Sequence, residues 1–212
     1  MISPRLSREN IVAIAIEIAD EDGLDSVTLR GIAARLAVHV TSLYNHVPDK
    51  EAVLDEMREA LLAEARLPTG RLDWEDWARQ FAAGMRALGR KHPGAIAAFH
   101  HGPAKGEGSA EPFESGFAAF RAAGYDAATT YNAVKALVVA VLGYILEDTL
   151  PLRRKKAART DIRGLPIERF PNVHAMNRVA GRTDTFGYLV EALIAGIAST
   201  RKARTRRKRA SA

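Results

Sequence analysis

Apolar residues recur with a helical period in almost every segment of the chain, and this pattern limits the possible folds more than any other feature. Between Ser7 and Gly23, for example, Ile11, Ala15 and Ile18 repeat at helical spacing. Ser7 is a favourable N-cap, and Gly23 can end the helix in a left-handed conformation. No segment alternates convincingly as a strand would, so we expect an all-α fold.

Caps and helix breakers divide this periodicity into separate elements. Thr28 and Asp49 are favourable N-caps, and Pro48 cannot continue a helix that precedes it. We expect helices at about 28–36, 40–47, 49–65, 73–91, 94–100, 109–123, 126–148 and 184–201. The Gly/Pro-rich stretch 102–108 and most of 149–172 are expected to be loops.

Pro68-Thr69-Gly70 is typical of a linker between two units. We therefore expect an N-terminal domain at 1–66 and a helical C-terminal domain at 67–200. Residues 201–212 offer no apolar face to bury, and we expect a disordered basic tail there.

Composition excludes several classes of protein. The 212 residues include no cysteine, so there is no disulfide framework and no thiolate zinc site. The N-terminus has charges throughout its apolar stretch, unlike a signal peptide, and the apolar run Ala136–Leu146 is shorter than the ~20 residues of a membrane helix. No nucleophile elbow, phosphate loop or zinc-protease motif occurs. We expect a cytoplasmic protein that is neither an enzyme nor a membrane partner.

The net charge of +6 favours a nucleic-acid partner only in part. The tail Arg201–Ala212 holds seven Lys/Arg and no acid, which leaves a net charge of −1 on the rest. Residues 1–66 hold seven basic and twelve acidic residues, a net charge of −5. Charge alone therefore does not identify the N-terminal unit as a DNA-binding domain.

Spacing in residues 28–47 is a stronger indication. A bracing helix at Thr28–Leu36, a break at Ala37-Val38-His39 and a second helix at Val40–Val47 have the geometry of a helix-turn-helix, whose second helix enters the major groove. Leu43 and Val47 would face inward at i, i+4. An ordinary αα-corner has the same spacing and remains the alternative.

The outward-facing residues of this unit suit contact with DNA. The methyl groups of Val40 and Thr41 can touch thymine, and Arg30 can bind guanine or phosphate. Thr28 and Lys50 lie at helix N-termini, where a phosphate is favoured. The candidate DNA-binding residues are Thr28, Arg30, Val40, Thr41, Ser42, Tyr44, Asn45, His46 and Lys50.

This region closely resembles the N-terminal signature of the tetracycline-repressor (TetR) family. The residues that carry the resemblance are Val27-Thr28-Leu29-Arg30-Gly31-Ile32-Ala33-Ala34-Arg35-Leu36-Ala37-Val38, Leu43-Tyr44-Asn45-His46-Val47 and Lys50. The resemblance implies phosphate contacts at Thr28, Tyr44, His46 and Lys50, and base contacts at Arg30, Val40, Thr41 and Ser42. Two positions depart from the pattern: Ala37 replaces the glycine of the turn, and His39 occupies an N-cap position.

Residues 185–197 are similar to the last helix of the subgroup nearest the tetracycline repressor itself. The resemblance implies that this helix and 126–148 build a homodimer, although a core helix within one chain has the same pattern. It also implies a small-molecule effector in the C-terminal domain.

An effector pocket needs apolar walls and a few polar groups. The candidates are Phe81, Met85, Phe99, His100, Phe117, Phe120, Tyr131 and Glu147, each of which also suits an ordinary helical core. Leu146-Glu147-Asp148 resembles the ending at which the tetracycline repressor helps to hold a metal–drug complex, and His100 stands near a loop where that repressor has a His. A metal-assisted effector therefore remains an alternative. Arg66 stands where that repressor has a drug-contacting His, so we do not expect tetracycline as the effector. We also expect no cofactor.

The sequence therefore predicts a transcriptional regulator, by family habit a repressor, that binds a palindromic double-stranded operator as a homodimer and is released by a small effector. The alternative is a non-specific DNA-binding protein driven by its basic tail.

Overall fold

The computed structural model describes residues 6–102, 105–153 and 164–210, and all regular structure in these ranges is helical. This confirms the all-α fold. Contacts group the chain into two compact units, Met1–Arg153 and Arg154–Ala212. Residues 154–163 of the predicted loop, and residues 103–104 of the shorter one, lie outside the described residues.

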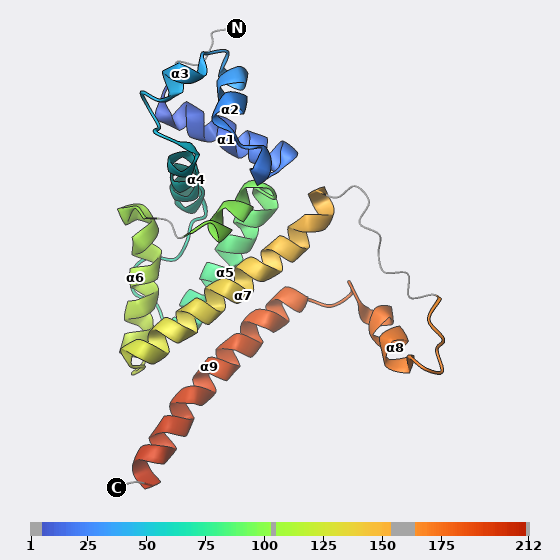
Figure 1. Ribbon diagram of the computed structural model, residues 1–212. Helices are drawn as coiled ribbons and strands as arrows, with labels where there is room; N and C mark the ends of the chain where they lie inside the picture. The colour runs from blue at the N-terminus through green and yellow to red at the C-terminus, as the bar shows by residue number, and fades with distance from the viewer. Residues whose placement is uncertain (1–5, 103–104, 154–163, 211–212) are drawn as a thin grey trace. The chain divides into compact units, whose positions relative to one another are not determined.

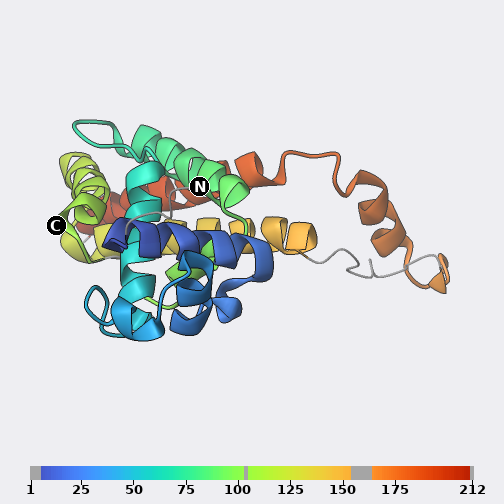
Figure 2. The ribbon, with the colours of Figure 1, turned by 90° about the horizontal axis from the view of Figure 1, so that it is seen from above.

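The first unit begins with three helices and a turn of 3-10 helix. They are α1 (Arg8–Asp22), η1 (Leu24–Ser26), α2 (Leu29–Leu36) and α3 (Val40–Leu43). Helix α4 (Lys50–Glu64) crosses α1 steeply and leads from α1–α3 to the rest of the unit (Figures 1 and 2). Side chains that pack between these helices are fully buried, among them Ile11, Ile32, Leu43 and Met57.

The remainder of the first unit consists of α5 (Trp74–Lys91), η2 (Ala95–His100), α6 (Glu107–Ala122) and α7 (Ala127–Arg153). Helix α5 packs against both α6 and α7, and α4 contacts α6 and η2. The predicted domain boundary near Arg66 lies inside this unit, at a turn where Arg66 has a φ of 46°.

Helix α7 is long and apolar enough to cross a membrane by length and composition, but one such helix is weak support for a membrane span. In this chain α7 packs its Leu137, Val141 and Ile145 side chains into the core of a helical unit, against α5 among others. A core helix of a globular protein has the same composition.

The second unit contains α8 (Pro171–Val179) and α9 (Thr185–Ala210). Phe186, Val190 and Ile194 are buried residues of α9, whereas Leu189 and Leu193 are half-buried.

The structure differs from the sequence-based expectation at several helix ends. Helix α3 stops at Leu43 and turns continue to His46, whereas a helix to Val47 was expected. Helix α7 passes Pro151 and ends at Arg153, so the proline lies in its last turn. Helix α8 was not predicted, since its short segment lies beside Pro166 and Pro171.

Helix α9 continues through Ala210, where the sequence predicted a disordered tail from residue 201. Arg, Lys and Ala favour helix, and no Gly or Pro follows Gly196 in the sequence. Extending an existing helix needs no new nucleation, so a charged segment can stay helical without an apolar face of its own.

Candidate DNA-reading surface and effector pocket

Helix α2 begins at the predicted cap. The side chain of Thr28 accepts a hydrogen bond from the Gly31 N–H at 3.0 Å, and Thr28 itself is exposed. Its hydroxyl proton therefore remains for a second partner, such as a phosphate oxygen. The cap and the proposed phosphate contact are compatible at one residue.

The turn between α2 and α3 is built around Ala37, which has φ 54° and ψ 42° in the left-handed region. The Val38 N–H donates to the Ala33 carbonyl at 3.0 Å, as in a Schellman motif. Glycine adopts this conformation without strain, but alanine does not. Ala37 therefore keeps the turn geometry that the family's glycine would give, at a cost in stability.

Helix α3 buries Leu43, and Val47 after it is buried as well, as their spacing predicted. Thr41, Tyr44 and Asn45 are exposed, and Tyr44 is the most conspicuous, with 55% of its surface accessible. The half-buried residues of the candidate set are Val40, Ser42 and His46. His39 provides no side-chain cap, so the first turn of α3 is held by packing.

Charged side chains around this surface fall into two groups. Arg30 and Lys50 are exposed and form no ion pair within the described part of the chain. Arg35 instead binds Glu21 at 2.5 Å and lies 3.8 Å from Asp22. The hydrogen bond from Arg35 lowers the pKa of Glu21. The acidic end of α1 is therefore partly neutralised by Arg35, while Arg30 and Lys50 remain available to phosphates.

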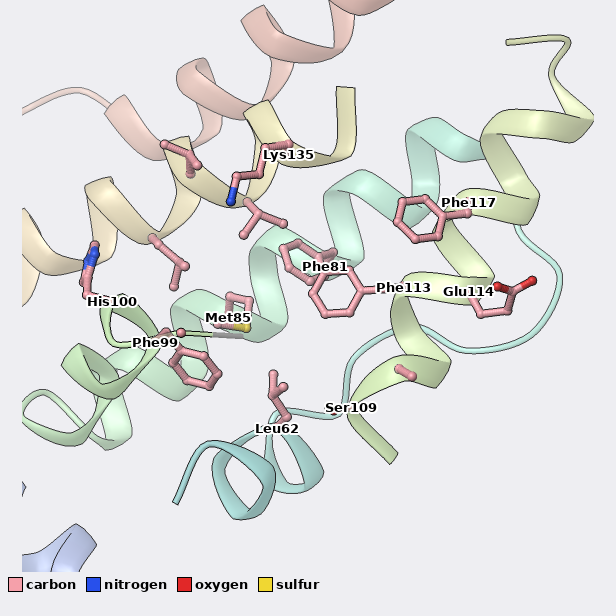
Figure 3. A pocket seen from close by; sticks show the side chains of 15 residues that line it. Leu62, Phe81, Met85, Phe99, His100, Ser109, Phe113, Glu114, Phe117 and Lys135 are labelled. Carbon is pink, nitrogen blue, oxygen red and sulfur yellow. The ribbon is translucent and has the colours of Figure 1, made fainter. Parts of the chain in front are cut away.

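Between α5, α6, α7 and η2 lies a pocket of about 760 Å³, a size that suits a drug-like molecule (Figure 3). Its walls are mostly apolar and come from elements far apart in the sequence. The lining residues are Leu62, Phe81, Met85, Phe99, His100, Gly102, Ser109, Ala110, Phe113, Glu114, Phe117, Lys135, Val138, Val139 and Leu142.

Five of the predicted effector residues line this pocket: Phe81, Met85, Phe99, His100 and Phe117. The other three lie elsewhere. Phe120 is fully buried beside Trp74, Trp77 and Tyr125, Tyr131 is 61% exposed, and Glu147 is exposed near the end of α7. The sequence does not distinguish an aromatic residue of the core from one that lines a pocket, and Phe120 is therefore among the predicted effector residues.

Sequence reasoning missed most of the pocket's α6 and α7 walls. Lys135, Val138, Val139 and Leu142 repeat at i, i+3, i+4 and i+7 along α7, so a helical wheel would have placed them on one face. Phe113 and Phe117 share a face of α6 in the same way. The missing information was which of the two apolar faces of α7 meets α5.

Trp77, which does not line the pocket itself, packs against the pocket's aromatic wall. Trp77 stacks on Phe81 with ring centroids 5.1 Å apart, and its indole N–H donates to the Pro112 carbonyl at 2.9 Å. A side chain at Gly116 would collide with the Trp77 ring, 2.4 Å from its Cβ, so α5 and α6 approach closely there. Phe81 therefore has a fixed orientation before any ligand arrives.

Residues next to the pocket also contact α4. The Glu59 carboxylate accepts hydrogen bonds from the Lys105 and Gly106 N–H groups at 2.6 and 2.5 Å. Ser109, a pocket residue, lies 2.9 Å from the same carboxylate oxygen. One α4 side chain thus holds the segment that leads from the pocket into α6.

Arg58 makes a second link from α4. This side chain is 99% buried and donates to the Ala98 carbonyl at 3.2 Å, next to pocket residue Phe99. It also bonds to Asp55 and lies 3.5 Å from Glu51. The two acidic partners lie on α4 itself, so the hydrogen bond to the Ala98 carbonyl is the contact by which Arg58 links α4 to η2.

Helix α1 meets η2 at a third joint. Asp20 accepts hydrogen bonds from the Gly94 and Ala95 N–H groups, both at 2.9 Å, and lies 2.7 Å from His92. The other ring nitrogen of His92 lies 3.2 Å from Glu64. A Cβ on Gly94 would lie 1.8 Å from the Ala19 carbonyl oxygen, so only glycine fits there.

Within the described residues, no group of three or more His, Asp or Glu side chains could hold a metal ion. His100 lines the pocket, whereas Glu147 does not. The two residues that the resemblance linked to a metal–drug complex are therefore not brought together in one pocket wall.

An outward-facing helix-turn-helix joined through α4 to a ligand-sized pocket defines a DNA-binding regulator with a sensory domain. Residues 11–57 match the family model described as bacterial regulatory proteins, tetR family. The chain is 34% identical over 148 residues to a transcriptional regulator of the helix-turn-helix type from Saccharopolyspora erythraea, covering 69% of this chain and 63% of that protein. It is 30% identical over 171 residues to the class D tetracycline repressor protein of Escherichia coli, covering 79% of this chain and 76% of the repressor.

The chain therefore belongs to the tetR family and is a transcriptional regulator of that family. The fold is also that of the Streptomyces coelicolor protein ActR, solved in complex with actinorhodin. The TM-score is 0.75 and the identity 22%, over 93% of this chain and 97% of ActR.

Proposed function

We propose that this chain represses transcription by binding a palindromic operator as a homodimer, and that a small molecule in the α5–α7 pocket releases it. The observation that carries the proposal is a set of hydrogen bonds made by the Glu59 carboxylate of α4, the helix that follows the helix-turn-helix. These bonds join α4 to Lys105 and Ser109 beside the pocket. DNA reading and ligand binding are thereby linked within one compact unit.

In this proposal α3 lies in the major groove. Thr41 and Ser42 face base edges, with the Val40 methyl groups beside thymine. Arg30, from α2, contacts a base or its border. Thr28, Tyr44, His46 and Lys50 bind phosphates and fix the position of α3, and Asn45 flanks them. The exposure of Tyr44 supports this, because its hydroxyl is accessible to a phosphate oxygen.

The homodimer would be formed by α7 and α9. Support comes from an exposed aromatic side chain on each helix, Tyr131 on α7 and Tyr188 on α9. Two copies of α3 would then reach successive major grooves, ~34–36 Å apart, and the operator would be approximately palindromic.

Release would be a population shift. A ligand that favours one arrangement of α6 and η2 acts on α4 through Glu59 and Arg58, and so on the spacing of the two α3 helices. Only a ligand with different affinities for the two states can do this. In this scheme residues 1–66 read DNA in the cytoplasm, and residues 67–200 dimerise and sense the effector.

Selection of bound sites from random double-stranded DNA tests the proposal. We expect enrichment of a palindrome with half-site centres about 10 base pairs apart, and release of that DNA by some members of a metabolite panel. Enrichment of no sequence above background would contradict it.

A second function, sequence-independent DNA binding, is favoured by the seven basic residues between Arg201 and Arg209, which continue α9 as one helix. The same selection distinguishes the two, because binding through phosphates alone enriches no sequence.

A further inference from the structure

Polar groups in the α5–α7 pocket are not equally available to a ligand. Ser109 is buried, and its hydroxyl lies 2.7 Å from the Gly106 carbonyl and 2.9 Å from Glu59. Its single proton is therefore engaged within the protein. The polar side chains that remain for a ligand are His100, Glu114 and Lys135.

Lys135 is an exposed cation at the pocket wall. It forms no ion pair within the described ranges, and α7 carries no acid within two turns of it on either side. Figure 3 shows its side chain directed from α7 to the side of the pocket where His100 lies, with Glu114 at the opposite end beyond Phe113. The end of the pocket near Lys135 is therefore suited to a negative charge.

Four phenylalanines from three elements contribute to the apolar lining, together with aliphatic residues and Met85: Phe81 of α5, Phe99 of η2, and Phe113 and Phe117 of α6. The rings of Phe81 and Phe113 are 5.8 Å apart and inclined at 56°. Such a pair offers both ring faces and ring edges to a flat guest. Because Trp77 stacks on Phe81, this part of the pocket wall loses little freedom when a ligand binds. A rigid aromatic ligand likewise loses less freedom than a flexible chain.

We infer that the effector is a planar aromatic acid, whose ring system packs among Phe81, Phe113 and Phe117 and whose carboxylate or phenolate is bound by Lys135. This inference rests on the proposed function, since it assigns the chemical class of the ligand to the proposed effector pocket. A neutral aromatic compound and an aromatic amine are the competing classes.

Isothermal calorimetry with three probes on the full chain tests the inference. The probes are anthraquinone-2-carboxylate, the neutral anthraquinone-2-carboxamide and cationic 2-(aminomethyl)anthraquinone. We expect the carboxylate to bind about tenfold more tightly than the carboxamide, as one charge-assisted contact implies. Lys135→Met should remove this preference and leave the Kd of the carboxamide unchanged.

Two further variants act as controls. Arg71→Met removes an exposed cation outside the pocket and should keep the tenfold preference. Glu114→Gln removes the carboxylate at the other end and should leave carboxylate binding equal or slightly tighter. Unchanged melting temperatures establish that each variant is folded.

Several results would overturn the inference: no binding of either the carboxylate or the carboxamide, equal affinities for both, a preference that survives Lys135→Met, or tightest binding by the amine with loss in Glu114→Gln. Because calorimetry involves no DNA, its outcome is separate from the site-selection result. A carboxylate preference with no selected operator would leave the pocket assignment standing and the regulatory role refuted.

Discussion

Ala37 is the residue at which the chain differs most informatively from its family. With φ 54°, it holds the left-handed conformation that positions α3 after α2, although it carries a Cβ. A single residue in this region costs of order 1 kcal/mol, and the surrounding hydrogen bonds of Ala33 and Ala34 keep it there.

Replacing Ala37 with glycine should therefore stabilise the protein. We expect Ala37→Gly to raise the free energy of unfolding by about 0.5–1 kcal/mol, measured by urea denaturation, since relief of strain exceeds the added freedom of the unfolded chain. Ala34→Gly, one turn earlier on the exposed side of α2, should lower it by about the same amount. Destabilisation by both substitutions would refute the strain argument.

Residue types also determine how far the sequence could predict the site. The caps at Ser7, Thr28 and Asp49 and the inward positions Leu43 and Val47 follow from local rules, and the structure confirms them. Gly23 does end α1, but with φ 97° and ψ 159° rather than a left-handed helical ψ. The glycine was predictable from the sequence, whereas its ψ depends on the η1 turn that follows.

At the scale of elements, α4 connects helices α1–α3 to the pocket. It carries Asp55, Arg58 and Glu59 on the side that meets η2 and α6. Sequence patterns predicted the helix but not these partners, because they are 40 to 50 residues away along the chain. Long-range pairing of charged side chains has no periodic signal.

Loss of Glu59 should weaken communication rather than ligand binding. In Glu59→Ala we expect the Kd of the releasing ligand to change less than threefold, while the ligand-induced loss of operator affinity falls at least tenfold. Fluorescence anisotropy of labelled operator, with and without ligand, measures this. Glu56→Ala is the matched control, because Glu56 pairs with Arg8 of α1 and has no pocket contact. An equal reduction of ligand-induced release in Glu59→Ala and Glu56→Ala would contradict the role assigned to Glu59.

The contact between Asp55 and Lys105 predicts a dependence on pH. The hydrogen bond from Lys105 is the main cause of a lowered pKa at Asp55, with Arg58 adding to it. A carboxyl with a lowered pKa contributes stability above its unfolded pKa of about 3.9, and this stability is lost as the pH falls through the folded value. Melting temperatures between pH 5 and 2.5 should fall more steeply in the wild type than in Lys105→Met. Parallel curves of melting temperature against pH for the two proteins would show that the contact between Asp55 and Lys105 contributes nothing to stability.

At the scale of the whole molecule, charge is distributed unevenly. Residues 1–66 have a net charge of −5, while the end of α9 carries seven basic residues. The positions of these charges follow from the sequence, and α9 continues to Ala210. A basic helix can add phosphate contacts to any DNA without reading its sequence.

Truncation after Thr200 should therefore weaken binding to operator and to random DNA by similar factors and reduce the salt dependence of both. Anisotropy titrations from 50 to 200 mM salt test this, with a slope reduction of about 0.9 for each phosphate contact removed. A loss of operator discrimination on truncation would show instead that the end of α9 takes part in reading the sequence.

Operator binding by Tyr44 variants tests the central claim most directly, namely that the α2–α3 surface reads DNA. With the operator obtained by selection, Tyr44→Ala should lose at least 1.4 kcal/mol of binding free energy, about tenfold in Kd, without a change in melting temperature. Tyr44→Phe keeps the ring and loses the hydroxyl, and its operator affinity should lie between those of Tyr44→Ala and the wild type. If Tyr44→Ala binds the same operator with wild-type affinity, α3 does not lie in the groove as proposed and the account is wrong.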